Sequence, residues 1–76
     1  MKQEYLQQIF WEVEAKNLSA LSDEQVIARA LSHGTLPIIQ GLFQEYDKDA
    51  LRAVFVGMKE SSLDARRYAY FNEVLA

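Results

Sequence analysis

Apolar residues recur every three to four positions along almost the whole chain, the spacing that places side chains on one face of an α-helix. Alternation of apolar and polar residues, which is typical of a half-buried strand, is limited to the short stretch Trp11–Glu14. The pattern therefore predicts an all-α fold. We expect a compact bundle of about five short helices, packed as successive antiparallel hairpins.

The first helix is predicted over Gln3–Val13. Its apolar positions form a single face, and Trp11 lies partly off that face. Small and turn-forming residues follow at 14–21, where Leu18 and Leu21 are expected to anchor the connection to the core. The residues of the apolar face are Tyr5, Leu6, Ile9, Phe10 and Val13.

The second helix has the clearest start signal in the chain. Ser22 is placed to accept a hydrogen bond from the third helical residue, and the Gln25 side chain is placed to reach back to the cap amide. Gly34 is expected to end the helix in a left-handed conformation, which gives the range Asp23–His33. The predicted buried residues are Val26, Ile27, Ala30 and Leu31.

Two more helices are predicted after Gly34. Thr35 is expected to cap the third helix, whose first turn tolerates Pro37 because an amide there has no helical partner. Asp47 or Asp49 is expected to cap the fourth. The third helix has its apolar face at Leu36, Ile39, Leu42, Phe43 and Tyr46, and the fourth has Leu51, Val54, Phe55 and Met58.

The last helix is predicted from the capping-box spacing of Ser61 and Asp64. Its apolar positions again recur every three to four residues. Because compact domains rarely subdivide below about 100 residues, residues 1–76 are expected to form a single helical domain. The apolar positions are Tyr68, Phe71, Val74 and Leu75.

Composition argues against an enzyme or a metal site. The chain has no cysteine and one histidine, so disulfides and thiolate metal sites are excluded and no cofactor is predicted. His33 falls in the last turn of a helix, where a histidine commonly favours the negative helix end. Asp47–Asp49 resembles the start of a calcium loop, but Arg52 and Met58 occupy the positions that need glycine and glutamate. No nucleophile, base and orienting group can be matched.

The charge distribution leaves a nucleic-acid role as the weaker alternative. The net charge of −3 disfavours non-specific attraction to phosphates, although basic residues concentrate in the second half of the chain. The Gly34–Thr35 turn between two helices also fits a helix-turn-helix. Acidic residues in the same half cancel the basic excess. The candidate phosphate contacts are Arg52, Lys59, Arg66 and Arg67.

Aromatic residues suggest a protein-binding surface. Half of the chain is hydrophobic, which is more than five small helices easily hide. Most aromatics at helical spacing, including Phe10 and Trp11, are expected in the core, with exposure of some of them as the alternative. The candidate binding patch is Phe10, Trp11, Glu12 and Glu14. A cytoplasmic location without membrane contact is expected, because no apolar run reaches the length of a signal peptide core or a bilayer span.

Four segments resemble a small bacterial domain family of uncharacterised function: 9–13, 26–36, 62–64 and 70–71. Members read Phe-Trp-Asp-Val-Asp near the start and carry a Gly-Thr-Leu turn, matched here by Phe10–Trp11 and Gly34–Leu36. This chain has Glu12 where the family has aspartate and Ile39 where it has tryptophan. Genes of the family often lie beside nucleotidyltransferase-type abortive-infection toxins, so the resemblance implies a toxin-antitoxin or partner-regulating role.

The sequence thus predicts a non-enzymatic protein-interaction domain. The resemblance implies an antitoxin-like or regulatory partner of a larger enzyme, and the alternative is a helix-turn-helix-like DNA-binding regulator. A protein partner is expected, and its identity and the oligomeric state stay open.

Overall fold

The computed structural model describes residues 2–58 and 63–75. In this part of the chain all regular structure is helical, which confirms the all-α prediction. The elements in chain order are α1 (Gln3–Ile9), the 3₁₀-helix η1 (Ala15–Ala20), α2 (Asp23–His33), α3 (Leu36–Glu45), α4 (Lys48–Gly57) and α5 (Ala65–Leu75).

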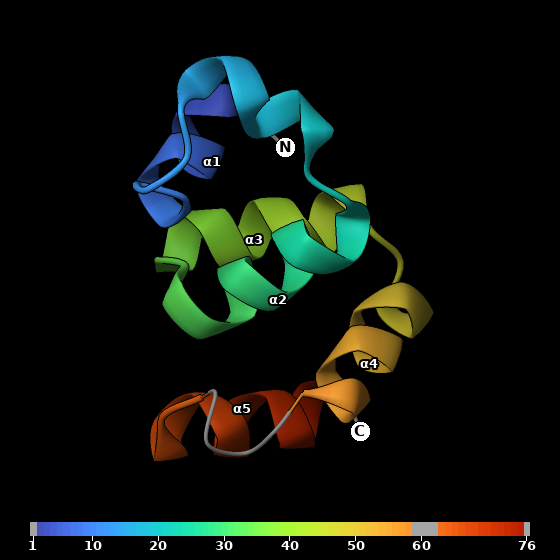
Figure 1. The fold of residues 1–76 in the computed structure, drawn as a ribbon. Coiled ribbons are helices and arrows are strands. Elements are labelled where there is room, and N and C mark those ends of the chain that lie inside the picture. The colour runs from blue at the N-terminus through green and yellow to red at the C-terminus, as the bar shows by residue number, and fades with distance from the viewer. Residues whose placement is uncertain (1, 59–62, 76) are drawn as a thin grey trace.

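Helices α2 and α3 lie in the middle of the molecule, with α1 and η1 on one side and α4 and α5 on the other (Figure 1). Helix α2 contacts α1, α3 and α4, and α4 contacts α5. The radius of gyration is 11.8 Å, close to the value of about 11 Å expected for a compact chain of this length. Among the described helices, none combines the length and apolar content needed to cross a membrane.

Every helix contributes to one apolar core. Within residues 2–58 and 63–75, no polar or charged residue is buried, so the core is held by packing alone. The buried residues are Ile9, Phe10, Leu18, Val26, Ile27, Ala30, Leu31, Ile38, Ile39, Leu42, Leu51, Phe55, Leu63, Phe71 and Leu75.

Local capping signals predicted the start of α2 and narrowed the start of α4 to a cap at Asp47 or Asp49, of which the structure uses Asp47. Ser22 Oγ accepts from the Gln25 amide at 3.2 Å, and Gln25 Oε1 accepts from the Ser22 amide at 2.8 Å, which completes a capping box at the start of α2. Asp47 caps α4 by accepting from the Ala50 amide at 2.8 Å. These contacts need only neighbouring residues, so local sequence is enough to predict them.

The end of the first helix was predicted incorrectly. Helix α1 ends at Ile9 instead of Val13, because Phe10 leaves the helical conformation with φ −120° and ψ 57°. At this end, side chains donate hydrogen bonds to backbone carbonyls. Gln7 Nε2 donates to the carbonyls of Phe10 and Val13, and Arg29 from α2 donates to that of Ile9. The two hydrogen bonds from Gln7 are local, whereas the third comes from Arg29, which only the tertiary fold brings to this turn.

The turn between α2 and α3 differs from the prediction in two ways. Gly34 is not left-handed, since its φ is −70°. Glycine is required there for space, because a Cβ atom would lie 2.5 Å from the Ala30 carbonyl oxygen. Leu36 was predicted on the buried face but is 68% exposed, and Ile38 is buried instead. Thr35 holds the cap position of α3 without a side-chain cap hydrogen bond.

Helix α5 begins after a single capping residue. Asp64 Oδ1 accepts from the Arg67 amide at 2.8 Å, so Asp64 itself caps the helix and the first helical residue is Ala65. Ser61, the predicted cap, lies outside the described residues.

Candidate protein-binding surface around Trp11

Trp11 lies on the surface directly after α1 and is 63% exposed. The expected core position of Trp11 is therefore wrong, and the alternative, an exposed aromatic side chain, is correct for this residue. The neighbouring Phe10 is only 4% exposed, so its proposed place in an exposed patch is wrong. The turn that ends α1 directs Phe10 into the core and leaves Trp11 outside, because successive residues in a non-helical turn face different directions.

Arg29 of α2 holds this turn in place. Its Nη1 donates to the Ile9 carbonyl at 2.9 Å, and its Nη2 lies 2.7 Å from Glu12 Oε1. The guanidinium carbon is 4.7 Å from the centre of the Phe10 ring and 5.3 Å from that of Trp11. One planar cation therefore bonds to the backbone, pairs with an acid and contacts two aromatic rings.

His33 supports Trp11 from the end of α2. The centres of the two rings are 5.5 Å apart, and the rings meet edge to face at 67°. The His33 Nδ1 atom lies 2.8 Å from Ser32 Oγ. The histidine occupies the last turn of its helix, as the sequence predicted, but its ring contacts Trp11 as well. We call Trp11, Glu12, Arg29 and His33 the Trp11 surface.

The two acidic residues of the predicted patch are both in ion pairs. The hydrogen bond from Arg29 is the main cause that lowers the pKa of Glu12 below its ordinary value. Glu14 lies 3.3 Å from Lys16, and both of these side chains are more than two-thirds exposed. Such a solvated pair contributes little to stability. The patch is therefore one exposed aromatic ring beside paired charges, and it is not a free acidic surface.

The lowered pKa of Glu12 leads to a pH prediction. A carboxyl group with a lower pKa in the folded state stabilises the fold above its unfolded pKa, and this contribution is lost as the pH falls through the folded value. We expect acidification to change Trp11 fluorescence with a midpoint below the ordinary glutamate value of 4.5, because protonation releases Arg29. Glu12→Gln should abolish this transition and Glu14→Gln should retain it. A midpoint at or above 4.5 would contradict the prediction.

Arg67, a candidate phosphate contact, is used inside the fold. Its Nη1 donates to the Leu31 carbonyl at 3.1 Å and its Nη2 to the Gly34 carbonyl at 2.7 Å. Its Nε also lies 3.6 Å from Asp64 Oδ2. The guanidinium thus fastens α5 to the C-terminal end of α2, where helix carbonyls lack partners.

The other candidate phosphate contacts are spread over different elements. Arg52 of α4 lies 2.7 Å from Asp49, and Arg66 is exposed on α5. Lys59 lies outside the described residues. With Arg67 bonded to backbone carbonyls, no specific observation favours a DNA-binding face.

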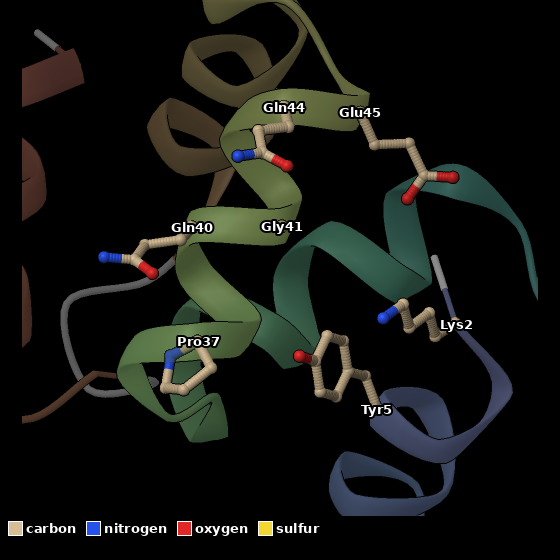
Figure 2. A pocket seen from close by; sticks show the side chains of 7 residues that line it. All are labelled: Lys2, Tyr5, Pro37, Gln40, Gly41, Gln44 and Glu45. Carbon is tan, nitrogen blue, oxygen red and sulfur yellow. The ribbon is translucent and has the colours of Figure 1, made fainter.

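A cleft of about 400 Å³ lies between the start of α1 and α3 (Figure 2). Lys2 and Tyr5 face α3 across it, and the Lys2 Nζ atom is 5.8 Å from the centre of the Tyr5 ring. Its lining offers no hydroxyl or thiol nucleophile beside a histidine base. Across residues 2–58 and 63–75, no group of three histidine or acidic side chains is placed to hold a metal ion. The lining residues are Lys2, Tyr5, Pro37, Gln40, Gly41, Gln44 and Glu45.

Arg29 and His33 are the functional candidates that sequence reasoning missed. Arg29 is 20 residues from Ile9 in the chain, and no spacing rule predicts a contact over that separation. The sequence offered one weak signal for Arg29: its long cationic side chain lies next to the buried apolar residues of an amphipathic helix.

Comparison with models of known protein families, with curated proteins and with solved structures finds no match to this chain.

Proposed function

We propose that this protein is a protein-interaction domain without catalytic activity of its own, and that its partner binds the Trp11 surface. The supporting observation is that Trp11 is 63% exposed and yet contacts both Arg29 and His33. Tryptophan and arginine are enriched among the residues that dominate binding energy at protein interfaces. A ring that is already held in position loses less conformational freedom on binding than a free one.

The chemistry of the Trp11 surface indicates what the binding site on the partner should look like. Trp11 would fill an apolar pocket on the partner, while the charged groups of Glu12 and Arg29 would lie at the polar rim. The family resemblance supports the class of partner: a larger cytoplasmic enzyme that this domain neutralises or regulates. Weakly basic partner surfaces suit the net charge of −3.

Trp11→Ala should weaken capture of the partner. We expect a loss of about 2 kcal/mol in binding free energy, or roughly 30-fold in Kd, because an aromatic anchor is removed. The measurement compares proteins retained from an extract of the native cells by the tagged wild-type domain and by the variant. Val56→Ala is the matched control, since Val56 is an exposed apolar residue on α4, a helix that contributes no residue to the Trp11 surface.

Fluorescence gives a second readout of the same proposal. Trp11 is the only tryptophan, so its emission reports on this surface alone. Iodide should quench the emission of the free domain, and addition of the enriched partner should protect it. If the same partner binds the wild-type and Trp11→Ala domains equally, or leaves Trp11 open to iodide, the proposal is wrong.

A further inference from the structure

A second apolar surface lies where the first turn of α3 meets α5. Both elements adjoin the C-terminal end of α2, and in Figure 1 the turn between α2 and α3 and the start of α5 lie on the same side of the molecule. A cleft of about 260 Å³ opens there, and we call it the α3–α5 cleft. It is lined by Gly34, Leu36, Ile39, Arg66, Arg67, Tyr70 and Phe71.

The cleft combines a buried floor with exposed apolar walls. Ile39 and Phe71 are 7% and 2% exposed, whereas Leu36 and Tyr70 are 68% and 51% exposed. The Tyr70 ring meets the Phe71 ring edge to face with their centres 5.1 Å apart, so the core holds this wall in position. Exposed apolar groups on two helices, facing a shared space, are typical of a groove that takes an apolar side chain of another protein.

The charge of the cleft is positive, although the chain as a whole is acidic. Among the residues that the structure describes, two arginines line the cleft and no acidic residue does. Arg67 is bonded to carbonyls and lies 3.6 Å from Asp64. The Arg66 side chain makes no hydrogen bond or ion pair with the residues that the structure describes. A guanidinium that pairs with none of the described residues, at the rim of an apolar cleft, favours a ligand that carries a carboxylate beside an apolar group.

We infer that the α3–α5 cleft binds an acidic amphipathic segment of another protein. One apolar side chain of that segment lies between Leu36 and Tyr70, and a neighbouring carboxylate pairs with Arg66. The cleft volume of about 260 Å³ is smaller than that of pockets for small organic ligands, which usually enclose about 300–1,000 Å³. We therefore expect it to accept a single side chain. A second copy of this chain is disfavoured, since a symmetric contact brings two Arg66 side chains to the same interface. The inference does not involve Trp11.

Helical peptides of defined chemistry test the inference on the full chain. Each carries one leucine, phenylalanine or tryptophan at the insertion position, further leucines three and four residues apart, and glutamates between them. Matched peptides have glutamine in place of every glutamate. Fluorescence anisotropy of labelled peptides at low salt measures Kd. We expect the glutamate peptides to bind more tightly, with an advantage that salt reduces.

Variants of the walls and the rim should separate the two contributions. Leu36→Ser and Tyr70→Ser should each weaken binding by about tenfold, because each removes apolar contact area. Arg66→Gln should weaken it by about two- to fivefold, as expected for an exposed ion pair. Val56→Ser and Arg52→Gln on α4 are the matched controls and should change nothing. Trp11→Ala should also leave peptide binding unchanged, which separates this inference from the proposed function.

Three results would overturn the inference. The first is that no glutamate peptide binds, or that the glutamine peptides bind equally well. The second is that Leu36→Ser and Tyr70→Ser both behave like Val56→Ser. The third is that sedimentation finds the protein dimeric and Tyr70→Ser makes it monomeric, because a second copy then occupies the cleft.

Discussion

Gly34→Ala is expected to lower the free energy of unfolding by about 2–3 kcal/mol. The new Cβ atom would lie 2.5 Å from the Ala30 carbonyl oxygen and 3.1 Å from Ile38 Cγ2. The first atom belongs to the backbone of α2 and the second to a fully buried side chain, so neither moves freely. Overpacking of this kind costs about 1–3 kcal/mol. The upper end applies because any shift also disturbs the hydrogen bond from Arg67 to the Gly34 carbonyl.

This loss is large for so short a chain. Domains are stabilised by about 0.05–0.15 kcal/mol per residue, which gives roughly 4–11 kcal/mol here. Chemical denaturation followed by circular dichroism measures the change, provided that the denaturant dependence is the same in both proteins.

Gly57→Ala is the matched control and should act in the opposite direction. Gly57 ends α4, and among the described residues no atom outside its chain neighbours and its own helix backbone lies within 4 Å of the position its Cβ would occupy. Its φ is not positive, so alanine fits without strain. We expect the free energy of unfolding to rise by about 0.4–1 kcal/mol, because the unfolded chain loses conformational freedom. If Gly34→Ala is neutral, or if both variants destabilise the domain alike, the steric account of Gly34 is wrong.

Arg29→Met is expected to lower the free energy of unfolding by about 2 kcal/mol. Methionine keeps much of the aliphatic stem but removes the charged hydrogen bond to the Ile9 carbonyl, worth about 1.5–3 kcal/mol. It also removes the cation from the rings of Phe10 and Trp11, and such contacts contribute about 0.5–1 kcal/mol. The ion pair with Glu12 adds little to this loss of about 2 kcal/mol, because the Glu12 carboxylate is solvated.

The same substitution should release the Trp11 surface. Without Arg29, residues 10–13 keep the Gln7 hydrogen bonds but lose their fastening to α2. Amide hydrogen exchange in this segment should accelerate, and iodide should quench Trp11 more strongly. Arg52→Met is the control, since exposed Asp49 is the ion-pair partner of Arg52 among the described residues, and it should change stability by less than about 0.5 kcal/mol. Equal effects of the two substitutions would contradict the role assigned to Arg29.

At the candidate site, the sequence predicted the surroundings of Trp11 and Phe10 only in part. Its position partly off the apolar face of the first helix gave a reason to consider it exposed. Two predictions for Phe10 conflicted. Helical periodicity placed it in the core, whereas its position next to Trp11 was the reason to include it in the binding patch. The deciding event is the end of α1 at Ile9, which gives consecutive residues different environments.

The sequence by itself determined the features that depend on neighbouring residues. Apolar spacing predicted the all-α fold, and the Ser22–Gln25 capping box predicted the start of α2, because hydrogen bonds over three residues follow from local order. For α4 the sequence left Asp47 and Asp49 open as the cap, and the structure uses Asp47. Only the tertiary structure decided where the first helix ends, why residue 34 is glycine and what surrounds Trp11. Each of these depends on a contact with a packed neighbour: Arg29 on the Ile9 carbonyl, Ala30 and Ile38 beside Gly34, and His33 against the Trp11 ring. Local spacing does not determine which surfaces meet when the helices pack, so these contacts could not be read from it.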